Sequence, residues 1–188
     1  MPNGNPELNK QTAAGIAVAA EPQEDFVQAT ITGEYSSFDS IQKRADVADG
    51  SYNVSSGFFK TTCGALVNAS GEADLLALKQ SRVYGSGQAR IDATDRSMVV
   101  ATDQAKVTAS GYAAVLATGY AKVYASESSI VTAMDGSEVY ASGRVKIKAF
   151  GCATVYASGD SEVEVSEPTM CNIYVYGNAK KVIIPQLP

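Results

Sequence analysis

The sequence predicts an all-β fold, a β-solenoid of octapeptide repeats with about sixteen residues per coil and an N-terminal cap and flexible arm. Two observations predict it. An apolar residue returns at every eighth position, and the outward residues alternate in character with twice that period. The apolar residue, which we number position zero of each octad, is Phe59, Val67, Leu75, Val83, Ile91, Val99, Val107, Val115, Val123, Val131, Val139, Ile147, Val155 and Val163.

The remaining even positions of the octad are equally regular. Position two is nearly always Ala, position four is mostly Gly or an acidic residue, and position six is small. A fixed period with a small-residue consensus is typical of repeat architectures. Because positions six, zero and two alternate as the inward side of a strand requires, and position four supplies turn residues, each octad is predicted to form one short strand and one tight turn.

A single octad cannot enclose a core, because a strand has one inward face that must bury against another layer. Two octads per coil would bring two layers of Val together across a thin interior. We therefore expect Val123 and Val131 to lie in opposing strands of one coil, with Val139 stacked on Val123. The period does not decide the hand of the solenoid.

The outward positions seven and one give the two faces different characters. One face is apolar, and we predict it as an oligomer interface formed by Met98, Val100, Leu116 and Ile130. It could be covered by a strand at 27–31 folded back or by another copy of the chain. The other face carries a file of tyrosines that either stabilises the solenoid by stacking or forms a candidate binding face for sugars or protein: Tyr124, Tyr140 and Tyr156.

The chain divides into three predicted segments. Residues 1–25, rich in Pro, Asn, Gln and Ala, are expected to form a flexible or anchoring arm. Residues 26–58 are predicted to cap the N-terminal end of the solenoid, with a strand at 27–32, a helix at 37–45 and a loop at 46–57. Residues 59–188 form the solenoid and its closing coil, in which the octad resumes two residues late at Ile173.

Composition argues against several classes of function. The 188 residues fit one domain, and a net charge of -5 with scattered Lys and Arg argues against nucleic-acid binding. The chain has no His, the commonest general base and metal ligand, and its three Cys show no paired spacing. No apolar run is long enough to span a membrane. We expect no catalytic residues, no cofactor and no metal.

Acidic residues were considered for two kinds of chemistry. The turn acids such as Asp95, Asp103 and Glu127 lack the paired Gly-Gly-x-Gly-x-Asp turns of calcium-binding β-rolls, so we interpret them as turn residues. A catalytic carboxylate pair drawn from Asp92, Asp95, Asp160 and Glu162 would need a cleft, and uniform octads leave no insertion to build one.

The octads Val123-Tyr124-Ala125-Ser126 and Val155-Tyr156-Ala157-Ser158-Gly159-Asp160 resemble the Val-x-Ala-x-Gly-x-Ala repeats of bacteriophage structural and fibre-like proteins and some bacterial surface proteins. The resemblance covers roughly residues 59–165. It implies a structural, non-enzymatic role in a virion, as a head fibre, decoration or tail accessory protein made in the host cytoplasm, or a place on the bacterial cell surface.

The apolar face predicts a homo-oligomer, and the resemblance favours a trimer over a dimer. Residues 1–25 are expected to attach it to other virion or surface proteins. The alternative function is a small carbohydrate-binding or polysaccharide-degrading β-helix module.

Overall fold

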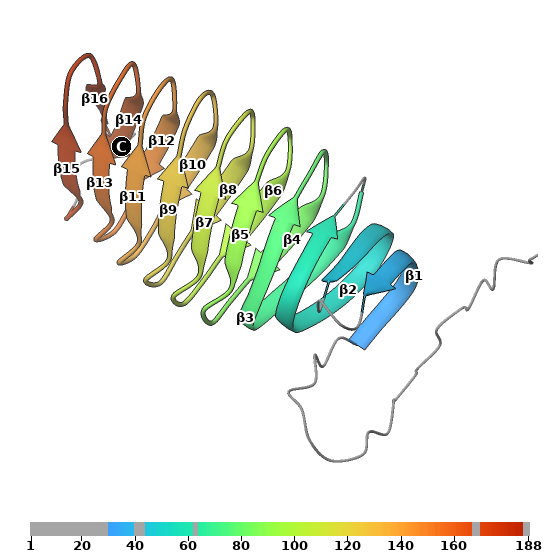
Figure 1. Ribbon diagram of the computed structural model, residues 1–188. Helices are drawn as coiled ribbons and strands as arrows, with labels where there is room; N and C mark the ends of the chain where they lie inside the picture. Colours follow the sequence, from blue (N-terminus) through green and yellow to red (C-terminus); the bar gives the residue numbers. More distant parts are fainter. Residues whose placement is uncertain (1–29, 40–43, 62–63, 167–169, 186–188) are drawn as a thin grey trace, which may run out of the picture.

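The computed structural model describes residues 30–39, 44–61, 64–166 and 170–185, and their side chains from residue 50 onward. Within these residues the chain forms strands and turns and no helix. Figure 1 shows the coils stacked one after another along a single axis, with a strand on each side of every coil. The predicted all-β solenoid is confirmed.

The strands form two sheets, which we call odd and even after their numbering, and which share β3. The N-terminal strands are β1 (Thr30–Asp39), β2 (Arg44–Thr61) and β3 (Leu66–Ala77). The odd sheet continues through β5 (Arg90–Ala93), β7 (Lys106–Ala109), β9 (Lys122–Ala125), β11 (Glu138–Ala141), β13 (Thr154–Ala157) and β15 (Asn172–Val175). The even sheet continues through β4 (Arg82–Gly85), β6 (Met98–Ala101), β8 (Ala114–Ala117), β10 (Ile130–Ala133), β12 (Lys146–Ala149), β14 (Glu162–Ser166) and β16 (Lys180–Ile184).

The register confirms a coil of sixteen residues. Val139 on β11 pairs in parallel with Val123 on β9, whereas Val131 lies on β10 and pairs with Val115 and Ile147. Successive octads therefore alternate between the two sheets, as the alternation of the outward residues predicted. From β4 to β14, each strand residue rests on the residue sixteen places earlier.

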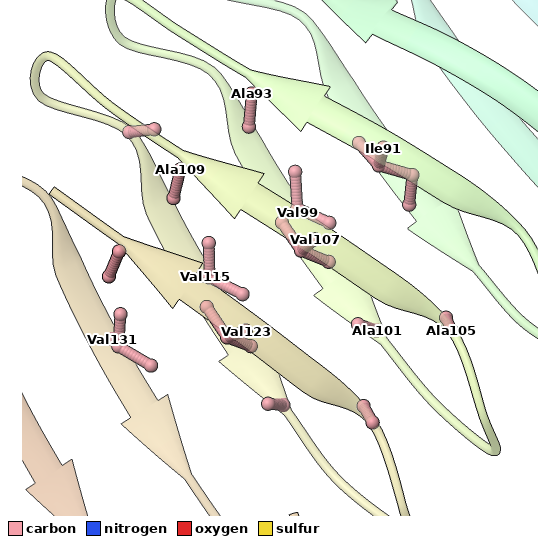
Figure 2. Close-up of a cluster of buried hydrophobic side chains, with 14 of the residues drawn as sticks. Ile91, Ala93, Val99, Ala101, Ala105, Val107, Ala109, Val115, Val123 and Val131 are labelled. Carbon is pink, nitrogen blue, oxygen red and sulfur yellow. The ribbon is translucent and has the colours of Figure 1, made fainter. Parts of the chain in front are cut away.

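The core is a thin double layer of small side chains. Residues at positions zero, two and six point inward and are almost completely buried. Figure 2 shows Val107 and Val123 facing Val99, Val115 and Val131 across this layer. Because Ala or another small residue flanks Val on both sides, the two sheets approach closely where the coil turns. From Ala65 onward the buried core of the described residues therefore contains no aromatic side chain.

Gly85 stands where almost every other coil has Ala at position two. A Cβ built on Gly85 would lie 2.4 Å from Cδ1 of Ile91, which faces it from the odd sheet. Ile91 is one of only two Ile residues at position zero; the other positions carry mainly Val. The missing methyl at Gly85 thus makes room for the additional methyl of Ile91.

The N-terminal segment differs from its prediction. The helix expected at 37–45 is wrong: β1 and β2 form an antiparallel pair in which Phe38 faces Ala45 and Asp39 faces Arg44. The strand expected at 27–32 does not end at Gly33 but continues to Asp39, and residues 27–29 lie outside the described residues. An open solenoid edge offers a row of unpaired backbone groups, and satisfying them outweighs the weak local helical pattern.

The loop expected at 46–57 is also wrong, because this stretch belongs to β2. From Ser51 onward β2 already stacks in parallel on β3, with one register shift between Val54 and Ser56. Tyr52 and Phe59 are fully buried and bring the largest side chains of the core to this end. The arm predicted at 1–25 lies outside the described residues.

At the other end the two-residue delay is confirmed. Ile173 on β15 pairs with Val155, eighteen places earlier, and the inward position of β16 is taken by Lys181, which pairs with Val163. Lys181 is exposed at the edge of the sheet. An inward-pointing charge at a sheet edge discourages another strand from stacking there.

Replacing Val139 by Asp is expected to unfold the repeat region. Val139 is completely buried between Val123 and Val155, and an unpaired charge in such an interior costs several kcal/mol. Loss of the cooperative transition in thermal denaturation followed by circular dichroism would show it. Tyr112→Asp, at an exposed turn position, is the control and should melt like the wild type.

Gly85→Ala is expected to destabilise the fold by about 1–3 kcal/mol, because the added methyl overpacks the core against Ile91. Adding Ile91→Val should restore most of the loss by removing the opposing methyl. Urea denaturation of both single variants and the double variant measures this coupling. Additive effects of the two changes would contradict it.

Candidate functional site

The corners of the solenoid are built from acidic residues and Gly at position four. Asp95, Asp103, Glu127 and Asp135 all have φ between 55 and 57°, the left-handed region in which Asp is tolerated better than most residues. Their carboxylates accept hydrogen bonds from the backbone N–H one coil earlier, as in Glu127 to Gly111 at 2.9 Å and Asp95 to Lys79 at 3.1 Å. The turn acids therefore join consecutive corners.

The odd sheet carries the predicted file of tyrosines on its outer face. Tyr124, Tyr140 and Tyr156 stack in consecutive coils, and the structure adds Tyr174, so we call these four residues the tyrosine ladder. Neighbouring ring centroids are 4.9–5.2 Å apart and the rings are within 10° of parallel. Tyr174 follows Ile173 as Tyr156 follows Val155, so the two-residue delay in the sequence was the signal that could have identified it.

A polar network of side chains joins Tyr140 of the tyrosine ladder to Lys122 on β9. Glu138 accepts a hydrogen bond from the Tyr140 hydroxyl and pairs with Lys122 Nζ at 2.8 Å. The bond to Glu138 raises the pKa of Tyr140 from 10.0 to about 12 and raises the pKa of Lys122. The hydrogen bonds from Lys122 and then Tyr140 hold the pKa of Glu138 below its ordinary value.

Two shallow grooves run along the odd sheet. One, of about 340 Å³, lies beside the tyrosine ladder and is lined by ring and hydroxyl groups, including those of Ser126, Ser142 and Ser158. The other, of about 370 Å³, lies at the preceding corner and is lined by Gln88, Arg90, Gln104, Lys106, Tyr120 and Lys122. The second groove was not predicted from the sequence, although Arg90, Lys106 and Lys122 recur at the sixteen-residue step.

The even sheet presents the predicted apolar residues outward. We call Met98, Val100, Leu116 and Ile130 the apolar strip; they lie on the adjacent strands β6, β8 and β10. Met98 is 53% exposed and Ile130 is 49% exposed, while Val100 and Leu116 are half-buried by their neighbours. A strand at 27–31 was one of the two covers expected for the apolar strip. Of this strand the structure describes only residues 30 and 31, and they belong to β1, which pairs with β2.

The four acidic candidates for catalysis form two pairs of near neighbours along the chain, Asp92 with Asp95 and Asp160 with Glu162. Asp92 lies on the odd sheet and Glu162 on the even sheet, four coils or more apart, while Asp95 and Asp160 occupy corner turns. The described residues contain no group of three or more Cys, Asp or Glu side chains placed to hold a metal ion. Neither Cys152 nor Cys171 forms a disulfide within the described residues, and Cys63 lies outside them.

The part of the chain that the structure describes contains no helix long and apolar enough to cross a membrane. Comparison of the chain with protein-family models, with curated proteins and with solved structures gives no match.

Glu138→Gln is expected to return the pKa of Tyr140 from about 12 toward 10.0, because the charged acceptor of its hydroxyl proton is lost. Since the pKa is raised in the folded chain, the contribution of this bond to stability is complete below pH 10.0 and disappears as the pH rises through about 12. NMR of ¹³C-labelled tyrosine rings measures it, with Tyr140→Phe assigning the signal. Glu164→Gln, which breaks the Lys148 pair on the even sheet, is the matched control.

Proposed function

We propose that the chain is a non-enzymatic structural or adhesive component of a larger assembly. The observation that carries this proposal is the apolar strip, an exposed hydrophobic surface on the flank of an otherwise regular solenoid. From β4 to β14, consecutive strands are joined by turns of only four residues, such as 86–89 and 94–97. Such short turns favour a rod that acts through its flat faces over an enzyme with a cleft formed by loops.

The apolar strip supports contact with another protein surface. Leaving a large apolar side chain in water instead of burying it forgoes roughly 1.5–3 kcal/mol. Tyr84 on β4, which is half exposed and precedes Val100 in register, extends the surface by one strand. Charged residues bound it at the other end, where Lys146 and Lys148 occupy β12. A patch with this apolar centre and charged rim is typical of protein interfaces.

The partner that we propose for the apolar strip is another copy of the chain. A symmetric copy can cover the whole strip, whereas β1 is engaged with β2. The resemblance of the octads to phage fibre-like proteins favours a trimer over a dimer, a virion as the assembly, and the bacterial surface as the alternative location. In this proposal residues 1–25 connect the solenoid to other virion or surface proteins.

The second candidate is a carbohydrate-binding module, and the tyrosine ladder favours it. Three of its members, Tyr124, Tyr140 and Tyr156, line one groove together with Ser126, Ser142 and Ser158, and these hydroxyl-bearing side chains can exchange hydrogen bonds with sugar hydroxyls. Binding fits this arrangement better than polysaccharide cleavage, because turns of only four residues leave no loop to build a cleft beside the acidic residues. A module of this kind would also serve an adhesive component.

Leu116→Lys combined with Ile130→Lys is expected to release folded monomers from an oligomer, because two charges would enter the apolar strip. Light scattering with size-exclusion chromatography at micromolar concentration measures the mass, and circular dichroism verifies the fold.

Thr108→Lys combined with Thr154→Lys adds the same charge to the outer face of the odd sheet and should leave the oligomer intact. A wild-type chain that is monomeric at this concentration would overturn the proposed self-association. Purified virions lacking the chain would separately overturn the proposed location.

A further inference from the structure

The odd sheet brings three cations together in one file. Arg90, Lys106 and Lys122 occupy the same position on β5, β7 and β9 and pair directly in register. Neighbouring strands are about 4.8 Å apart, so the charged side chains stand side by side. The file is flanked by acids at its ends, with Asp74 one coil before Arg90 and Glu138 one coil after Lys122.

Lys106 is the central member and has cations on both sides. Its register neighbours are Arg90 and Lys122, and Lys122 is engaged with Glu138 at 2.8 Å. Like charges directly opposite on a sheet destabilise it. The solenoid has no structural need for a cation here, since the equivalent position carries Thr154 and Asn172 in later coils. An arrangement that costs stability without serving the fold indicates a ligand.

The wall opposite the cations is neutral. Gln88, Gln104 and Tyr120, from the preceding corner, complete the groove of about 370 Å³, and no carboxylate lines it. This is unusual for a chain with 20 acidic and 15 basic residues. The groove therefore offers positive charge next to amide and phenol groups that donate and accept hydrogen bonds.

We infer that this groove binds an acidic glycan, with a carboxylate or sulfate group seated on Lys106 between Arg90 and Lys122. Arg90 can hold either anion through two N–H groups, and the lysines supply point charges. Gln88, Gln104 and Tyr120 would then contact sugar hydroxyls. The straight file runs along the solenoid axis, so a linear polysaccharide can follow it from one coil to the next.

The surroundings favour a glycan over a nucleic acid. Single-stranded nucleic acids are held by aromatic ring faces on which bases stack. In the tyrosine ladder these faces are already stacked on one another at 4.9–5.2 Å, so ring edges and hydroxyls remain for a ligand.

The test is titration of the full chain with polygalacturonate, as the carboxylate probe, and with dextran sulfate, as the sulfate probe, by isothermal titration calorimetry. Saturable binding that weakens with salt is expected for at least one of them, and the comparison identifies the preferred anion. Neutral dextran and single-stranded oligothymidylate are the comparison ligands.

Lys106→Gln is expected to weaken glycan binding about three- to tenfold, the effect of one or two exposed charge contacts. It should also raise the melting temperature of the ligand-free chain by about 1–3 °C, because two repulsions are relieved. Lys146→Gln, the same residue at the same octad position on the even sheet, should leave binding unchanged. A purely structural lysine would not combine weaker binding with greater stability.

Three results would overturn the inference. These are the absence of saturable binding to both acidic glycans, an equal loss of affinity in Lys146→Gln, and tighter binding of oligothymidylate than of either glycan. The inference goes beyond the assembly role and does not depend on it, because Lys106 and the apolar strip lie on opposite sheets. The mass measured by light scattering should be the same for Lys106→Gln and the wild type.

Discussion

Parallel, in-register stacking of coils is the constraint on which the rest of this structure depends. The backbone N–H and C=O groups of each inner strand are satisfied by the strands one coil before and one coil after it, so every residue must tolerate the residue that stacks on it. Val stacks on Val in a thin core whose side chains are almost completely buried. The corners obey the same rule, because the turn acids reach back to backbone N–H groups of the preceding coil.

The same constraint makes the outer faces informative. Stacking repeats the same side-chain contact from coil to coil. Stacked aromatic rings stabilise the sheet in the tyrosine ladder, whereas stacked cations destabilise it in the file at Lys106. The network of Lys122, Glu138 and Tyr140 lies where the two files meet and balances the charge of the last cation. The two faces of the solenoid are thus chemically separate surfaces on one scaffold.

Much of this fold was predictable because its period is local in sequence. The coil length, the burial of Val123 and Val139 and the late resumption at Ile173 all follow from counting residues. The antiparallel pairing of β1 with β2 was not predictable from residues 37–45, because β1 pairs with backbone groups at the edge of the first coil that only the folded solenoid presents. Likewise, the fit of Gly85 to Ile91 and the hydrogen bonds of the turn acids involve atoms that only the coiled chain brings together.

The alternation of octads between two sheets also restricts how such a chain can change its length. Insertion or deletion of one octad would transfer every later residue to the opposite sheet, exchanging the tyrosine ladder and the apolar strip from that point onward. A change by a whole coil keeps both faces continuous. The two extra residues between β14 and β15 are accommodated without this exchange, because Tyr174 still stacks on Tyr156. A solenoid of this kind can therefore lengthen or shorten by whole coils while the tyrosine ladder and the apolar strip each stay on their own sheet.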